Sequence, residues 1–508
     1  MQRAVFRQRR GIGRRLSTQM SEMFVYDKQY INGEWIQSEN EEKSTIPVHD
    51  SNSGKIFAEV VDGCSKDTEK AIAAAKSAFQ EWSTVDLKTR KMYLHRILKE
   101  YNKRVEHVSE ALQKELGAPK YLADTFQSTS FAMHIEAVLK IADKFSWTEK
   151  IGDRSIVVRE PIGVCGLITP WNWPLNQIGA KLAPALLAGC TVVLKPSEIT
   201  PINAYIVAEA IHASDLPRGV FNMVCGTGPR VGQLLATHPD VDMLSFTGST
   251  AVGRSLHALG SSTVKRVRTE LGGKSACILL DDATRKQIVA MSTNVIGNTG
   301  QSCNALSRLL VPRKRYDEII EIVKAAFESV NIVSATDPSA KPGSMGPLAS
   351  RQQFEKVRRY IQTGIDEGAT LVTGGVERPE DPTLQPGGYF VQPTVFGDVT
   401  NEMTIFKEEI FGPVLCVMPY DTVEEAIEIA NDTIYGLNNA VAGKDIERAM
   451  KVARRLRSGQ VQVNTTSGTP LTPFGGYKQS GDGREWGKYG LEEFLQIKAI
   501  NVPKHSKL

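Results

Sequence analysis

Residues 164–194 read VCGLITPWNWPLNQIGAKLAPALLAGCTVVL, and this stretch decides the fold. The apolar runs at 164–168 and 191–194 have the length and composition of buried strands, and the segment at about 175–189 between them is helix-like. A strand, a helix and a second strand at this spacing predict a parallel βαβ unit.

The same alternation continues along the chain. Further strand-like runs lie at 220–224, 241–246 and 264–268, and further helix-like segments lie at about 203–213, 229–237 and 250–260. A parallel sheet covered by helices is the architecture of Rossmann-like nucleotide-binding units. The usual dinucleotide fingerprint is missing, because the glycine-rich stretch 226–232 has the wrong final spacing. The motif therefore gives only weak support for nucleotide binding.

Segments on either side of this unit extend the α/β pattern. Gly33 lies in a short polar stretch that predicts a turn, and helical spacing follows at 68–82 and 89–116. A second α/β stretch is predicted at about 277–460, with a helix at 351–367, a Gly/Pro-rich insertion at 379–388 and a strand at 389–396.

Length and composition restrict the class of protein. A chain of 508 residues is too long for one compact core, so two or three substructures are expected. No run of about 18 apolar residues is present, so no membrane span is predicted. The seven cysteines are scattered without a Cys-x-x-Cys pair, which disfavours a disulfide framework or a metal site and favours a reducing compartment.

Both ends of the chain resemble targeting signals. Residues 1–21 are rich in arginine and lack acids, as in a mitochondrial transit peptide, although a basic disordered arm has the same composition. The arm accounts for the positive net charge, so the rest of the chain is slightly acidic and no nucleic-acid partner is expected. The tail 504–508 ends in Ser506-Lys507-Leu508, the tripeptide read by the peroxisomal import receptor. The two addresses conflict, and initiation at Met20 or Met23 would leave only the second.

Two glycine-framed segments carry residues suited to covalent catalysis. Glu270 stands in the sequence ELGGK and Cys303 in the sequence GQSC. A thiolate can attack an electrophilic carbon, and a carboxylate can activate the water that releases the product. In the alternative interpretation Cys303 fills the core and Glu270 is a surface acid. If the site lowers its thiol pKa, Cys303 is expected to be the cysteine alkylated fastest near neutral pH.

Together with five further segments, these two resemble the signatures of the NAD(P)-dependent aldehyde dehydrogenases, in the same order, over about residues 24–502. The further segments are TPWNWP at 169–174, KPSE at 195–198, FTGST at 246–250, EEIFGP at 408–413 and PFGGYK at 473–478 followed by SG at 480–481. The resemblance implies an α/β fold with a Rossmann-like cofactor domain, a second α/β catalytic domain and a small β oligomerisation segment.

The resemblance also implies catalytic roles. Cys303 would be the nucleophile, and Asn172 with the backbone N–H of Cys303 would stabilise the oxyanion. Glu270 would activate the water that hydrolyses the thioester. Taken singly, Asn172 is equally compatible with a polar cap between a strand and a helix. Glu485 matches a glutamate proposed in the family to relay protons, and a surface salt bridge is the alternative interpretation.

Cofactor residues follow from the same match. Ser249 and the helix that begins near it offer N–H groups to a pyrophosphate, while Lys195 and Glu198 match residues that hold the adenosine ribose. A carboxylate at 198 favours NAD over NADP, although a first-turn helix acid has the same sequence pattern. The predicted cofactor-binding residues are Thr169, Trp171, Lys195, Ser197, Glu198, Gly248, Ser249, Glu409 and Phe411.

The implied organisation is a homodimer or homotetramer that acts on a small-molecule aldehyde. The predicted division is a dinucleotide-binding domain at 22–146 and 166–272, a catalytic domain at 273–479, and oligomerisation segments at 147–165 and 480–503 that pair between subunits. The entrance segment 465–472 lacks aromatics, and Ser302 and Asn304 are small and polar, so the substrate site is expected to be roomy. Alternative functions are a coenzyme A-acylating dehydrogenase, against which Glu270 argues, and a non-catalytic structural or binding protein.

Overall fold

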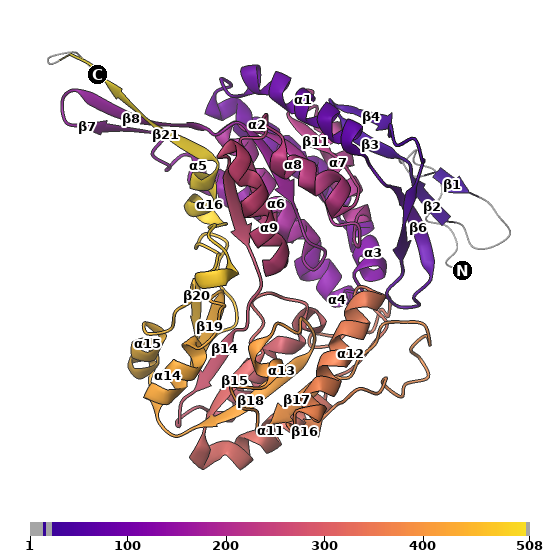
Figure 1. Cartoon of the computed structure of the whole chain (residues 1–508), viewed down its shortest axis with the longest axis vertical. Helices are drawn as coiled ribbons and strands as arrows, with labels where there is room; N and C mark the ends of the chain where they lie inside the picture. The colour runs from indigo at the N-terminus through magenta and orange to yellow at the C-terminus, as the bar shows by residue number, and fades with distance from the viewer. Residues whose placement is uncertain (1–13, 17–22, 504–508) are drawn as a thin grey trace.

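The computed structural model describes residues 14–16 and 23–503. Most of the predicted targeting arm and the whole tail 504–508 lie outside the described residues. Within the described part, the strands form two seven-stranded sheets, a four-stranded sheet and a three-stranded sheet. Figure 1 shows the two larger sheets in separate halves of the molecule, with helices around each.

The first seven-stranded sheet confirms the predicted Rossmann-like unit. Its strands, in spatial order, are β13 (Arg266–Glu270), β12 (Met243–Thr247), β9 (Val164–Ile168), β10 (Thr191–Lys195), β11 (Phe221–Met223), β3 (Lys28–Ile31) and β4 (Glu34–Gln37). The strands from β13 to β11 are parallel, and β3 and β4 form an antiparallel hairpin at one edge. The hairpin turn lies at Asn32 and Gly33, whose φ angles are 53° and 76°, as the predicted turn requires.

Helices cover this sheet and belong to the same half of the chain. They are α1 (Ser65–Trp82), α2 (Leu87–Asn102), α3 (Val105–Glu115), α4 (Lys120–Leu122), the π-turn η1 (Ala123–Gln127), α5 (Ser130–Ala142), α6 (Pro174–Ala188), α7 (Ile202–Ala213), the π-turn η2 (Gly228–Gly232), α8 (Gln233–Thr237), α9 (Thr250–Gly260) and η3 (Ser261–Thr263). The single helix predicted at 89–116 is wrong, since α2 and α3 are separate. The Arg104 side chain donates to the carbonyl of Glu100 and so takes an acceptor that a continuous helix would use.

The second seven-stranded sheet confirms the second α/β unit. Its strands, in spatial order, are β16 (Thr370–Thr373), β17 (Thr394–Gly397), β18 (Val414–Tyr420), β15 (Arg308–Pro312), β14 (Ala276–Leu279), β19 (Asn438–Ala442) and β20 (Gln460–Val463). Its helices are α10 (Arg285–Ser292), η4 (Thr293–Gly300), η5 (Arg313–Arg315), α11 (Tyr316–Glu328), α12 (Arg351–Asp366), α13 (Thr404–Lys407), α14 (Val423–Asn431) and α15 (Ile446–Ala453). The strand predicted at 389–396 is shorter, because Tyr389 bonds to Ser51 instead of a neighbouring strand.

The two smaller sheets lie at the margins. One joins β1 (Arg14–Leu16), β2 (Met23–Tyr26), β6 (Ile56–Val61) and β5 (Thr45–His49). The other joins β21 (Leu495–Asn501), β8 (Ser155–Pro161) and β7 (Thr148–Ile151), after η6 (Lys478–Ser480) and α16 (Gly487–Glu493), and projects as an arm in Figure 1. The predicted oligomerisation segments thus pair antiparallel with each other inside one chain, because the C-terminal strand returns alongside β8. Pairing of this arm with another subunit stays a prediction.

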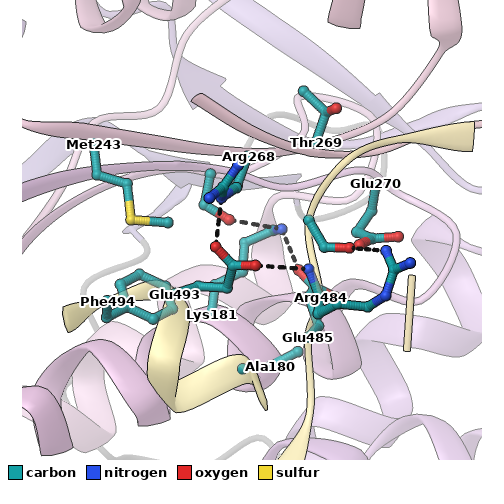
Figure 2. Close-up of a pocket in the computed structure, with 13 residues that line it drawn as sticks. Ala180, Lys181, Met243, Arg268, Thr269, Glu270, Arg484, Glu485, Glu493 and Phe494 are labelled. Atoms are coloured by element: carbon teal, nitrogen blue, oxygen red, sulfur yellow. Dashed lines mark hydrogen bonds and ion pairs between the residues drawn. The ribbon is translucent and has the colours of Figure 1, made fainter. Parts of the chain in front are cut away.

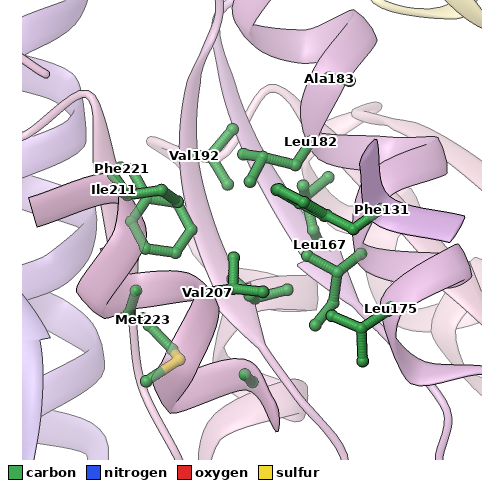
Figure 3. Packing of buried hydrophobic residues seen from close by; sticks show 14 of the residues in the cluster. Phe131, Leu167, Leu175, Leu182, Ala183, Val192, Val207, Ile211, Phe221 and Met223 are labelled. Atoms are coloured by element: carbon green, nitrogen blue, oxygen red, sulfur yellow. The ribbon is translucent and has the colours of Figure 1, made fainter. Parts of the chain in front are cut away.

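The core of the first unit packs around α6. Figure 3 shows Leu175 and Leu182 of this helix beside Val192 of β10 and Phe131 of α5. Burying apolar surface of this kind stabilises the fold by about 25 cal/mol per Å². Every residue of α6 except Asn176 is buried, which explains its nearly continuous apolar sequence. Among the described helices, none combines the length and the apolar character needed to cross a bilayer.

Candidate active site

The predicted cofactor residues gather at one edge of the first sheet. Thr169 follows β9, Lys195 ends β10, and Gly248 with Ser249 follows β12. Because these strands are parallel, their carboxyl ends meet at the same edge. The chain runs outward from β9 to β10 and β11 on one side and to β12 and β13 on the other, so the gap between β9 and β12 is the topological switch point where such sheets bind ligands.

Glycines let the connection between the two sheets pass close to the nucleophile loop. Glu270 ends β13, and residues 271–275 lead directly into β14 of the second sheet. A methyl group built on Gly273 would lie 2.2 Å from the carbonyl oxygen of Cys303, and one on Gly272 would lie 2.6 Å from Glu409. The N–H of Gly273 donates to the Glu409 carboxylate at 2.9 Å. The pair predicted from sequence, Glu270 and Cys303, is therefore brought together at the junction of the sheets.

The loop that carries Cys303 has an unusual backbone. Asn298, Thr299 and Gly300 are left-handed in succession, with φ angles of 53°, 56° and 72°. Two consecutive non-glycine residues in this region store strain, which surrounding contacts must hold in place. Thr299 donates to the Gly346 carbonyl at 3.0 Å, and a methyl on Gly300 would collide with the backbone of Gly412. The loop is thus clamped from both sides.

Asn172 is buried and bonds to this loop. Its amide donates to the Gln301 carbonyl at 3.0 Å, and its own carbonyl accepts from the Asn298 amide at 2.9 Å. No side chain caps α6, so the alternative interpretation of Asn172 as a helix cap is wrong. The neighbouring Trp173 donates its indole N–H to the Ser302 hydroxyl at 2.8 Å. The start of α6 is therefore attached to the residues just before Cys303.

Glu270 is buried, with only 3% of its surface exposed, so the interpretation as a surface acid is wrong. Within the part of the chain that the structure describes, neither carboxylate oxygen has a hydrogen-bond partner. Methyl groups built on Gly475 and Gly483 would lie 2.6 and 3.3 Å from its Oε1. Burial, followed by the charge of Glu485, raises the pKa of Glu270 well above its usual value. An unpartnered carboxylate with a raised pKa is suited to take a proton from water.

A buried ion pair lies beside Glu270. Lys181 of α6 pairs with Glu485 and donates to the Ser245 hydroxyl at 3.1 Å. Glu485 is 7% exposed, so the interpretation of a surface salt bridge is wrong. These groups line a cavity of about 10 Å³ that Glu270 also lines, room for about one water molecule. Figure 2 shows Lys181, Glu485 and Glu270 around it.

Cys303 is half-buried, as is Cys64, whereas Cys165, Cys190, Cys225, Cys277 and Cys416 are buried. The core-filling interpretation is therefore wrong for this residue. Burial, then the charges of Glu409 and Glu270, raises the pKa of the Cys303 thiol. This direction argues against a lowered thiol pKa, because burial disfavours the thiolate and the nearby charges belong to carboxylates.

Lys195 and Glu198, which are predicted to hold the adenosine ribose, form an ion pair with each other. The Lys195 ammonium donates to the Glu198 carboxylate at 2.8 Å, and the Glu198 side chain is 36% exposed at the sheet edge. Ser197 is buried, and its hydroxyl accepts from the N–H of Ile199. The partly exposed carboxylate at 198 is available to accept hydrogen bonds from a ribose.

The other predicted cofactor residues lie at neighbouring strand ends. The Ser249 hydroxyl accepts from Val252 and so caps α9. Trp171 and Phe411 meet edge to face, with ring centroids 5.4 Å apart. The hydroxyls of Thr169 and Thr247 are buried without a partner among the described residues. Unpartnered hydroxyls, the start of a helix and an acidic residue at the switch point fit a dinucleotide.

Sequence reasoning missed several residues of the site. Lys181 is the one charged residue in a mostly apolar helix, and that contrast was the available signal. Asn298 and Gln301, which connect Asn172 to the loop, carry no comparable signal, because their role depends on contacts across the chain.

Comparisons with known proteins identify the family of this chain. Residues 35–500 match the model of the aldehyde dehydrogenase family. A 3-succinoylsemialdehyde-pyridine dehydrogenase from Pseudomonas sp is 46% identical over 477 residues, covering 94% of this chain and 98% of the relative. The crystal structure of a cysteine-to-alanine mutant of aldehyde dehydrogenase C from Pseudomonas syringae, complexed with NAD+ and octanal, is 42% identical with a TM-score of 0.90, over 93% of this chain and 96% of that one.

A Mycobacterium tuberculosis aldehyde dehydrogenase complexed with NAD+ is 40% identical with a TM-score of 0.91, over 95% of this chain and 99% of that one. The chain belongs to the aldehyde dehydrogenase family, and the fold and enzyme class that the sequence predicted are confirmed.

Proposed function

We propose that this enzyme oxidises a small-molecule aldehyde to a carboxylic acid with NAD+, through a covalent intermediate on Cys303. The observation that carries the proposal is the contact at Gly273, which brings the nucleophile loop against the segment led by Glu270. The buried, unpartnered carboxylate of Glu270 and the half-buried thiol of Cys303 then share one site.

The first step forms a bond from the Cys303 sulfur to the aldehyde carbon, after the thiol has given its proton to water. The carbonyl oxygen becomes an oxyanion, which needs donors where the charge develops. The Asn172 amide has two N–H groups, of which one donates to Gln301. The other N–H and the backbone N–H of Cys303 are the donors we assign. Bound NAD+ supplies the hydride acceptor and a positively charged ring.

Hydrolysis completes the cycle. Glu270 accepts a proton from water, the hydroxide attacks the acyl carbon, and the bond from that carbon to the Cys303 sulfur breaks to release the acid. The raised pKa of Glu270 makes its carboxylate a stronger base than an exposed glutamate. The buried cavity with Lys181 and Glu485 offers a place for a single water next to it.

Preference for NAD over NADP rests on Glu198. Its carboxylate, paired with Lys195 and partly exposed, would accept hydrogen bonds from a ribose hydroxyl and repel a 2′-phosphate. Structures of relatives complexed with NAD+ support the binding of this nucleotide.

The test is a panel of aldehydes with NAD+ or NADP+, followed by NADH absorbance and by mass spectrometry of the product. The panel should include a medium-chain aliphatic aldehyde and a semialdehyde, since relatives are described with octanal and with a semialdehyde substrate. Formation of a free acid independent of coenzyme A supports the proposal. An acyl-coenzyme A product would instead support the acylating alternative, and no turnover with any aldehyde would support a non-catalytic protein.

A further inference from the structure

Gln127 of the π-turn η1 contacts two segments that lie far from it in the chain. Its side chain is fully buried. The Nε2 group donates to the backbone carbonyl of Asn172 at 3.1 Å and, over a longer distance of 3.4 Å, to Oδ1 of Asn298. A single amide therefore joins the segment that leads into α6 to the strained loop that precedes Cys303.

The turn that carries Gln127 is held in place by its neighbours. Its backbone is π-helical, with the N–H of Ser128 donating to the carbonyl of Ala123 at 3.0 Å. The hydroxyl of Tyr101 on α2 donates to the Ser128 carbonyl, and the Ser130 hydroxyl donates to the Gln127 carbonyl at 2.8 Å. Single π-turns of this kind occur often at functional sites. The Gln127 amide therefore extends from a fixed position.

The NH2 group of Gln127 orients the amides next to it. A side-chain amide has an accepting and a donating end, so its partners decide which way it faces. Because Oδ1 of Asn298 faces Gln127, the NH2 group of Asn298 faces the carbonyls of Asn172 at 2.9 Å and Gln301 at 3.2 Å. The Gln301 carbonyl also accepts one N–H of the Asn172 side chain at 3.0 Å. These bonds give the second N–H of Asn172 a fixed direction.

The Gln127 side chain also carries an unsatisfied acceptor. Within residues 14–16 and 23–503, its buried Oε1 has no hydrogen-bond partner. A buried acceptor without a partner destabilises a fold, and apolar groups of the same shape can be nearly neutral or stabilising. The stability of the fold therefore does not by itself account for a glutamine at this position, whereas the bonds that it donates to Asn172 and Asn298 do.

We propose that Gln127 is a positioning residue, which directs the second N–H of Asn172 toward the oxygen of the reacting aldehyde. The inference rests on the proposed function, in which Asn172 stabilises the oxyanion formed on attack by Cys303. Gln127 acts through Asn172. Donors that are already oriented before the charge develops stabilise it without a cost of reorganisation, so a misdirected Asn172 slows the first chemical step.

The experiment is a double-mutant cycle between Gln127 and Asn172, measured as kcat/KM for the aldehyde of the panel that the wild-type enzyme oxidises fastest. Gln127→Met keeps the approximate shape and removes the donor, and it should lower kcat/KM by about tenfold, the effect of about one hydrogen bond. Asn172→Ala should lower it by about 100–1000-fold. The double variant should be no worse than Asn172→Ala, because Gln127 then has no oxyanion donor to direct.

Gln127→Glu adds a pH test that a space-filling role would not pass. A buried carboxyl has a raised pKa, and only its protonated form can donate to the Asn172 carbonyl as the amide does. The kcat/KM of this variant, divided by that of the wild type at each pH, should therefore rise as the pH falls. A ratio that is independent of pH would contradict a role for the donated hydrogen bond.

The matched control is Gln113→Met, the same change at a buried glutamine of α3 whose Nε2 donates within its own helix, to Ser109. It should leave kcat/KM unaltered, and thermal unfolding should show that Gln127→Met remains folded. Wild-type kcat/KM in Gln127→Met, or losses that multiply in the double variant, would overturn the inference alone if Asn172→Ala is impaired. Absence of any aldehyde oxidation by the wild type would overturn the proposed function as well.

Discussion

The close approach of Gly273 to Cys303 makes Gly273→Ala the most direct test of the site geometry. The added methyl would lie 2.2 Å from the Cys303 carbonyl oxygen. A carbon and an oxygen in contact need about 1 Å more than this, so the loop that carries the sulfur must move by about that much. Misplacing a reacting group by about 1 Å costs about 100-fold in rate. We expect kcat to fall by about two orders of magnitude.

The variant should still fold, because overpacking costs about 1–3 kcal/mol against a typical stability of about 5–15 kcal/mol. Two control variants test whether the loss of activity follows the severity of the clash. Gly272→Ala meets the end of the flexible Glu409 side chain at 2.6 Å and should cost less. Gly297→Ala, close to Cys303 in sequence, meets nothing within 4 Å and should retain activity. The assay is NADH formation together with thermal unfolding and thiol titration. A folded Gly273→Ala enzyme with kcat within threefold of wild type would refute the close approach of Gly273 to Cys303.

Cys303→Ala should abolish NADH formation, while calorimetry should show that NAD+ still binds. Retained turnover would exclude Cys303 as the nucleophile. Glu270→Gln should give a burst of about one NADH per site and then slow turnover, so a wild-type steady-state rate would exclude the general base. Because Glu270 acts when ionised, hydrolysis rises with pH through its pKa. Glu485→Gln removes a charge that raises this pKa, so the acid limb of the pH–rate profile should move to lower pH. An unchanged profile would contradict an interaction between Glu485 and Glu270. Glu198→Gln should narrow the preference for NAD+ over NADP+ in kcat/KM, and an unchanged ratio would remove Glu198 from ribose recognition. The exposed Ile497 and Ile500 of the edge strand β21 should be covered in a dimer or tetramer, and light scattering that gives a monomer at micromolar concentration would contradict this.

The local sequence was sufficient to predict which segments form strands and helices. The alternation of strands and helices from Val164 onward predicted the parallel sheet, because period and run length are properties of neighbouring residues. The break between α2 and α3 was missed, since it depends on where the Arg104 side chain donates.

The sequence by itself determined the family and the alternation of strands and helices, and it predicted the reactive pair Glu270 and Cys303, because these depend on residue types in a fixed order. Only the tertiary structure decided the environment of each group. The burial of Glu270, the pair of Lys181 with Glu485, and the carboxylates that raise the Cys303 pKa come from segments far apart in the chain. Electrostatic interactions depend on distance in space and on exclusion of water, and neither is encoded in the spacing of residues along the sequence.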